Sequence, residues 1–168
     1  INSKTHLASV YNDIGIIYKN KGNFIKSLEY FYISLKINEE IKDKRGTSSN
    51  HYNIGEVSFN QNNINKAIKH YNLGLEIDKE LKDKNGISIG LANLGKANIK
   101  LKKYKEANKV LREAEKLCTQ IKTVKGLASI YYKLGLLNFE TNHFDSAKIY
   151  LQLSIDITEK NNLTNELS

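Results

Sequence analysis

The chain has 168 residues, with 26 Lys plus Arg against 18 Asp plus Glu, a single Cys, and no Pro, Met or Trp. One cysteine excludes a disulfide-stabilised scaffold, and no uninterrupted apolar run approaches the roughly 18 residues of a membrane-spanning helix. The formal net charge of +8 leaves nucleic acid, an acidic peptide and a membrane surface open as partners.

Two series of glycines recur along the chain with a period of forty residues. They are Gly15, Gly55, Gly95 and Gly135, and Gly46, Gly86 and Gly126. Twelve residues after each glycine of the first series comes a small residue, namely Ser27, Ala67, Ala107 and Ala147. We therefore predict a single array over residues 1–168, with repeats at about 7–45, 46–85, 86–125 and 126–162, and with 163–168 as the start of a further helix or a tail. Because the chain starts at Ile1 and contains no Met, we expect it to be a fragment of a larger protein.

Each repeat is predicted to form two helices. Over residues 24–41, and again over 64–81, apolar residues recur at the spacing of an amphipathic helix. Asn23 and Asn63 precede these helices as N-caps. The lysine-rich runs that end at Gly46 and Gly86 are predicted to stop the long helices, with glycine in the left-handed region. Stacked hairpins of this kind bury a continuous core, which predicts an all-α, right-handed superhelical solenoid of four helix-turn-helix repeats.

The pattern resembles the tetratricopeptide repeat in its forty-residue variety. The resemblance rests on Leu or Ile before the repeat glycine, a small residue twelve positions after it, and a bulky residue four beyond that: Phe31, Tyr71, Leu111 and Leu151. Two departures are the missing closing Pro and a Tyr three residues after the glycine that survives only as Tyr18. Relatives of this variety occur in polarity and G-protein-regulator scaffolds and in bacterial signalling proteins. The resemblance implies a protein-interaction module whose first helices line a concave, ligand-binding face.

Seven residues at that face are our candidate peptide-binding residues: Tyr52, Asn53, Asn93, Lys96, Lys100, Tyr132 and Lys133. An Asn amide can pair with the backbone of an extended peptide, because it offers both a donor and an acceptor. The lysines would pair with carboxylates, and the tyrosines would supply rigid contact area. The alternatives for the Asn residues are exposure to solvent or hydrogen bonding within the repeats, and the alternative for the Tyr residues is ordinary helix packing.

The positive charge is concentrated in one stretch. Residues 96–125 hold ten basic and three acidic residues, and the rest of the chain carries a net charge of only about +1. This stretch favours an acidic partner, although a run of surface lysines also occurs as a solvated face. No aromatic platform alternates with these lysines, so a basic nucleic-acid binder is a remote alternative.

No arrangement of residues indicates an enzyme, a metal site or a cofactor. The segment from Gly90 to Ala97 approaches a phosphate-binding loop, but Ala97 lacks the hydroxyl that would bind magnesium, and the segment lies in a predicted helix. Cys118 is predicted to be a small core residue. The histidines, His6, His51, His70 and His143, fall at four different repeat positions with no i, i+4 pair.

We therefore expect a non-enzymatic interaction module that binds an extended or helical, acidic segment of a protein or peptide in its concave groove. The alternative is a sensory or regulatory region of a larger signalling protein, a sensor kinase or transcription regulator, that responds to a peptide or self-associates. Self-association would use the C-terminal repeat. We expect no nucleic-acid or membrane partner. Nothing in this stretch indicates secretion, so we expect a cytoplasmic location.

Overall fold

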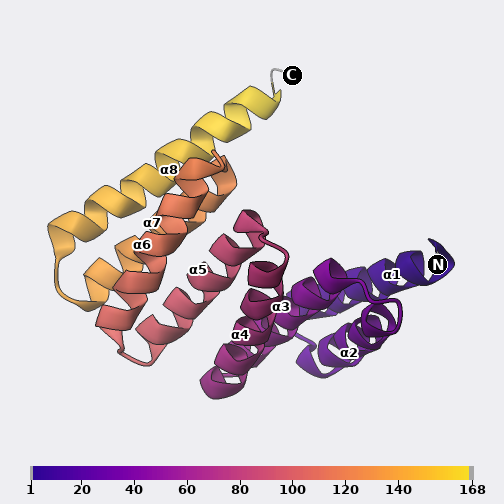
Figure 1. Ribbon diagram of the computed structural model, residues 1–168. Coiled ribbons are helices and arrows are strands. Elements are labelled where there is room, and N and C mark those ends of the chain that lie inside the picture. The colour runs from indigo at the N-terminus through magenta and orange to yellow at the C-terminus, as the bar shows by residue number, and fades with distance from the viewer. Residues whose placement is uncertain (1, 167–168) are drawn as a thin grey trace. The chain divides into compact units, whose positions relative to one another are not determined.

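The computed structural model describes residues 2–166 of the chain, and the side-chain surroundings of residues 3–160. Over this range the chain forms helices and turns and no strand (Figure 1). The helices are α1 (Asn2–Asn20), α2 (Phe24–Glu40), α3 (Lys44–Asn60), α4 (Ile64–Glu80), α5 (Lys84–Lys100), α6 (Tyr104–Gln120), α7 (Val124–Glu140) and α8 (Phe144–Glu166). The predicted all-α class and the two helices per repeat are confirmed.

The chain divides into two compact units, residues 1–86 and 87–168. The first unit holds α1 to α4 and the first residues of α5. Here α1 packs on α2, α3 packs on α4, and α2 packs on α3, as in stacked helical hairpins. The second unit holds the rest of α5 and α6 to α8, with α6 packed on α7 and α7 packed on α8. The buried apolar residues Phe31, Leu35, Ile54 and Val57 form a core cluster in the first unit.

The turns between repeats are built differently from the prediction. The left-handed residues are Lys42, Lys82 and Lys122, with φ of 58°, 53° and 54°. In the first of these turns, Gly46 comes four residues after Lys42 and already lies in the first turn of α3. The prediction that Gly46 and Gly86 end the long helices in the left-handed region is therefore wrong.

The second glycine series has a packing role instead. A Cβ on Gly46 would lie 2.5 Å from the amide of Asn38, and one on Gly126 would lie 2.7 Å from Cys118 Sγ. A Cβ on Gly86 would collide with the carboxylate of Asp78. These glycines therefore let the start of one repeat approach the end of the previous long helix.

The first glycine series also permits close packing. A Cβ on Gly55 would lie 2.5 Å from the ring of Tyr71, and one on Gly15 would lie 2.6 Å from the ring of Phe31. Ser27 adds a hydrogen bond from its hydroxyl to the carbonyl oxygen of Gly15 at 2.9 Å. The two helices of a repeat therefore approach closely at this glycine, and the bulky residue sixteen positions later fills the space.

The predicted N-caps within the repeats are present. The side chains of Asn23 and Asn63 accept hydrogen bonds from the backbone N–H groups of Lys26 and Lys66. Asp43, in the lysine-rich run that ends at Gly46, accepts from Gly46 N–H and caps α3. Each cap satisfies one of the N–H groups that a helix start leaves without an intrahelical partner.

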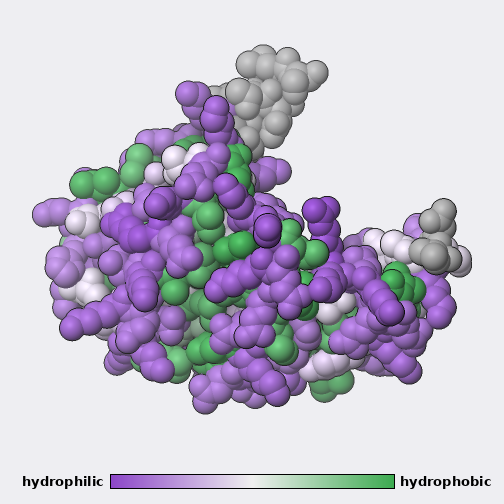
Figure 2. Space-filling model, in the orientation of Figure 1, coloured by the Kyte–Doolittle hydropathy of each residue, from purple (hydrophilic) through white to green (hydrophobic). Residues whose placement is uncertain are grey.

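The C-terminal end departs from the predicted pattern. We expected a further helix or a tail over residues 163–168, but α8 continues without a break to Glu166. Residues 167–168 lie outside the described part of the chain. No helix among the described residues combines the length and the apolar character that crossing a membrane requires. Hydrophilic residues cover most of the face that Figure 2 shows, with hydrophobic residues visible between them.

Candidate functional site

Tyr52 and Asn53 are neighbours on α3 with different surroundings. Tyr52 is only 9% exposed, and its hydroxyl donates to Asp78 Oδ2 on α4 at 2.6 Å. Burial raises the pKa of the Tyr52 phenol, and the Asp78 carboxylate raises it further, so the hydroxyl stays protonated. The structure thus places Tyr52 in helix packing, the alternative that the sequence left open for this candidate.

Asn53 is half-buried on the same helix. Its Nδ2 donates to Asn12 Oδ1 at 2.8 Å, which links α3 to α1. Within the described part of the chain, the side-chain oxygen Oδ1 of Asn53 and the side-chain nitrogen Nδ2 of Asn12 have no hydrogen-bond partner. An acceptor and a donor therefore lie next to each other on the face where the sequence predicts a ligand.

A buried polar network, absent from the sequence predictions, lies beneath this pair. Asn38 Nδ2 on α2 donates to Asn50 Oδ1 on α3 at 2.7 Å. Asn50 Nδ2 donates to Ser34 Oγ at 3.0 Å, and Ser34 Oγ donates to the carbonyl oxygen of Ala8 at 2.8 Å. One feature of the sequence indicated this network. Asn38 lies on the apolar side of the second helix of its repeat, at the position that Cys118 occupies two repeats later.

The network borders a cavity of about 260 Å³ between α1, α2 and the start of α3. We call it the repeat-one cavity. It is lined by Thr5, Ala8, Ser9, Asn12, Ser34, Asn38, Asp43, Gly46, Ser49 and Asn50. All but Ala8 and Gly46 carry polar side chains, so the cavity can hold a ligand through hydrogen bonds.

In the second unit, three candidates share one face of α5. Asn93 and Lys96 are half-buried, and Lys100 is exposed. Their spacing of three and four residues places them along the same side of the helix. The Asn93 amide makes no hydrogen bond to any other described residue.

The other two candidates are neighbours on α7. Tyr132 is 51% exposed. Lys133 is half-buried, and its Nζ donates to Ser129 Oγ at 2.7 Å. The same Nζ also donates to the carbonyl oxygen of Ser129 at 3.4 Å.

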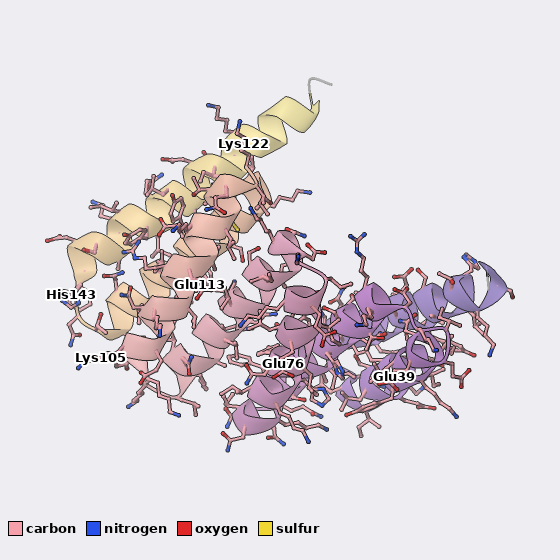
Figure 3. All side chains as sticks on the ribbon, in the orientation of Figure 1. Glu39, Glu76, Lys105, Glu113, Lys122 and His143 are labelled. Atoms are coloured by element: carbon pink, nitrogen blue, oxygen red, sulfur yellow. The ribbon has the colours of Figure 1, made fainter. Side chains whose placement is uncertain are left out.

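The remaining lysines of the basic stretch belong mostly to α6 and its ends. Figure 3 shows Lys105 near the start of α6 and Lys122 just beyond its end, with Glu113 between them on the helix. All three are exposed. Arg112 is engaged by Glu115, at 2.9 Å, and by the hydroxyl of Tyr150, at 2.7 Å. These side chains form a solvated face of α6.

His51 on α3 and His70 on α4 form a buried pair that the sequence analysis did not predict. Their Nδ1 atoms lie 3.2 Å apart, and the residues are 8% and 9% exposed. One ring must donate from Nδ1 while the other accepts, so the pair is held together by one shared proton. Burial lowers the pKa of His51, against the attraction of Glu39. Burial, followed by His51 and two nearby lysines, lowers the pKa of His70 to about 4.

The repeat explains where this pair comes from. The positions forty residues earlier hold Tyr11 and Tyr30, whose ring centroids lie 6.0 Å apart. The corresponding pair in the last repeat, Tyr131 and Tyr150, also lies at 6.0 Å. The sequence therefore did indicate this contact. Ring-bearing residues recur at the same two repeat positions, one on each helix of a repeat, and a search for i, i+4 pairs along a single helix misses them.

The other candidates for chemistry lie apart. Cys118 is fully buried, which confirms its predicted place in the core. His143 lies at the turn between α7 and α8 (Figure 3). Among the described residues, no three His, Cys, Asp or Glu side chains come together as metal ligands would.

Two family models, both described as tetratricopeptide repeat, match most of the chain. One matches residues 6–80, and the other matches residues 90–120 and 128–161. No curated protein sequence matches the chain at a significant level.

Several solved structures share the fold at low sequence identity. BtubC (BKLC) of P. vanneervenii superposes with a TM-score of 0.76 at 17% identity, covering 93% of this chain and 65% of that one. A Rap protein complexed with competence and sporulation factor has a TM-score of 0.83 at 16% identity, covering 90% and 43%. Aspartyl phosphate phosphatase F of Bacillus subtilis has a TM-score of 0.83 at 14% identity, covering 95% and 42%. The present chain thus spans less than two thirds of each of these proteins.

Proposed function

The chain belongs to the tetratricopeptide repeat family, a scaffold for protein–protein interaction, and we propose that it binds an extended or helical acidic segment of a protein or peptide. In the second unit, the segment would lie along α5 and α7. Binding, without chemical conversion of the ligand, would be its activity.

One observation carries this proposal: the face of α5 in the second unit combines Asn93 with two lysines. The Asn93 amide has no hydrogen-bond partner within the described residues, and Lys96 and Lys100 continue the same side of the helix. On α7, the half-exposed ring of Tyr132 and the ammonium of Lys133 add apolar contact and charge. None of these five positions carries an acid, so the local charge favours carboxylates.

The first unit supports the same function by different chemistry. The pair of Asn12 and Asn53 presents one donor and one acceptor, which match the N–H and C=O groups of an extended peptide backbone. Tyr52 does not take part in this proposal as a ligand contact, since its hydroxyl holds Asp78.

A fluorescence anisotropy titration tests the proposal. The probe is a fluorescein-labelled peptide of twelve alternating Glu and Ala residues, and the variant is Asn93→Ala with Lys96→Ala. We expect the double variant to bind about tenfold more weakly, because it loses one amide contact and one charge-assisted hydrogen bond.

The matched control is Asn108→Ala with Lys105→Ala, which removes the same two residue types from the exposed face of α6. Equal loss in both double variants would show that only general charge attracts the peptide, and it would refute the α5 site. Competition by single-stranded DNA of equal charge, as strong as by the unlabelled peptide, would refute the peptide in favour of nucleic acid.

A regulatory module within a longer protein is a second candidate. It is supported by the Rap protein complexed with competence and sporulation factor, of which this chain covers 43%. In that case the peptide would change the curvature of the repeats as well as bind. Small-angle X-ray scattering with and without the twelve-residue peptide would then show a change in radius of gyration, and an unchanged radius at saturation would exclude it.

Self-association through the C-terminal repeat also has a structural basis. In the first unit, Leu35 on α2 is 8% exposed because it packs with Ile54 and Val57 of α3. Ile155 stands at the same repeat position on α8 and is 49% exposed. We expect light scattering to show a dimer that Ile155→Glu dissociates and that Gln152→Glu, a control at an exposed position on α8, leaves intact. A monomer in all three proteins would contradict this proposal.

A further inference from the structure

The repeat-one cavity is open because the side chains that close the corresponding place in the second repeat are different. There, the ring of Tyr52 packs onto Gly74, and its hydroxyl donates to the carboxylate of Asp78. The matching three positions in the first repeat hold Asn12, Ser34 and Asn38. Asn12 is the shorter side chain, and its hydrogen bonds go to α3 and not to Asn38.

Asn38 presents an acceptor to this open space. The residue is 5% exposed, and its Nδ2 is used by Asn50. Its Oδ1 has no hydrogen-bond partner among the described residues, yet no fully enclosed side-chain oxygen in that part of the chain lacks a partner. Since Asn38 lines the cavity, its oxygen must be accessible from there. In the second repeat the matching group, Asp78, receives hydrogen bonds from Tyr52 and from Ser48.

The charge that lines the cavity is negative. Asp43 is its only ionisable lining residue. Asp43 Oδ1 accepts from Gly46 N–H at 3.0 Å, and the second carboxylate oxygen has no partner within the described range. The lysines at the starts of the nearby helices are engaged elsewhere: Lys4 with Glu40 at 3.1 Å, and Lys44 with Glu80 at 2.8 Å. A ligand in this cavity therefore meets a carboxylate and an amide oxygen, and no Lys or Arg is among the residues that line it.

From these observations we propose that the repeat-one cavity is a binding site for an organic cation, a primary ammonium or guanidinium group carried on a short aliphatic chain. The charged group donates hydrogen bonds to Asp43 and to Asn38 Oδ1, and the hydroxyl groups of the lining accept the remaining ones. The site lies within the first unit and is independent of the acidic-segment site on α5 and α7.

Small probes test the site directly. The ¹⁵N-labelled protein is titrated with n-butylammonium chloride at constant ionic strength, and the side-chain amide signals of Asn38 and Asn50 are followed by NMR. We expect saturable shifts with a Kd of about 1 mM, which is reasonable for a ligand of this size. The neutral isostere 1-butanol and the anion butyrate should leave these signals in place.

The decisive variant is Asp43→Asn. Asn caps a helix about as well as Asp, so the fold is kept while the charge is removed. We expect about tenfold weaker binding of n-butylammonium. The control is Asp83→Asn, at the same cap one repeat later, where Asp83 Oδ1 accepts from Gly86 N–H. This control changes the net charge equally and should bind as the wild type does.

Two further probes identify the source of the cation. Triglycine amide carries a peptide N-terminal ammonium, and N-acetyl-lysine methylamide carries a side-chain ammonium; the one that binds more tightly names the source. Absence of saturable shifts with every cation, equal shifts with 1-butanol, or unchanged affinity in Asp43→Asn would overturn the proposal and leave a cavity filled by water. Because no acidic peptide is used, this failure is distinct from failure of the α5 site.

Discussion

The first and second repeats, both within the first unit, share one backbone design and differ in what their side chains enclose. Where the second repeat has Tyr52 bonded to a buried Asp78, the first has Asn12 and Asn38 around an open cavity. The difference teaches that the repeat glycines determine how closely the helices approach. A few positions, in the middle of the first helix and near the end of the second helix of each repeat, then decide whether the space between the helices is closed or accessible.

The largest expected effect on stability is at the repeat position that holds Asn12 in the first repeat and Tyr52 in the second. Tyr52→Ala should lower the free energy of unfolding by about 3–5 kcal/mol, because it removes a buried aromatic ring and leaves Asp78 without one of its donors. Asn12→Ala, at the edge of an existing cavity, should lower it by only about 1 kcal/mol. Urea denaturation of both variants measures the difference, and equal losses would show that the two sites are not packed differently.

The next effect tests what the two repeats share. Gly15→Ala and Gly55→Ala would each drive a methyl group into a ring, that of Phe31 or Tyr71. Overpacking, partly offset by the better helix propensity of Ala, should lower the free energy of unfolding by about 2 kcal/mol in each repeat. Asn65→Ala, at an exposed site on α4, should change it by less than about 0.5 kcal/mol. A marked difference between the two glycine variants would contradict a shared scaffold.

A smaller effect concerns pH. The unfolded histidines have a pKa of about 6.5, whereas that of His70 in the folded chain is lowered to about 4 and that of His51 is also lowered. Between these values the unfolded chain binds more protons, so stability is present above pH 6.5 and is lost as the pH falls toward 4. We expect a loss of about 1–2 kcal/mol across this window.

The first repeat supplies the variant that tests this pH effect. His51→Tyr with His70→Tyr copies the Tyr11 and Tyr30 pair and should remove the acid sensitivity, as seen in thermal unfolding at pH 7.5 and pH 4.5. His143→Gln, at an exposed position, serves as the control. Unaltered acid sensitivity in the tyrosine double variant would assign the effect to other groups.

Much of the fold follows from the sequence, because a forty-residue period repeats the same physical requirements four times. The first glycine series, the small partner represented by Ser27 and the Asn23 cap were all predictable from local chemistry. The role of Gly46 was not, because glycine both ends helices and allows close approach. In the folded chain Asn38 lies so close to Gly46 that a Cβ would not fit, and this contact shows that Gly46 serves close approach.

The candidate site was predictable in part, for a similar reason. The repeat position indicated that Asn53 lies on the ligand face, but not that Asn12 would be its hydrogen-bond partner. For Tyr52 the same position could not decide between packing and binding, since that choice depends on Asp78 twenty-six residues later. The cavity beside Asn38 arises from what its neighbours lack, and a single sequence pattern does not reveal such a space.

The most direct test of this comparison is to convert the first repeat into the second. Wild type and the triple variant Asn12→Tyr, Ser34→Gly and Asn38→Asp are titrated side by side with n-butylammonium chloride, following the backbone amide signal of Gly46. Ser34→Gly is included because Tyr52 packs onto Gly74, where a Cβ would collide with its ring. The introduced tyrosine should donate to the introduced carboxylate, as Tyr52 does to Asp78, and close the cavity. We predict saturable shifts in the wild type and none in the triple variant. Equal binding by both proteins would contradict the account.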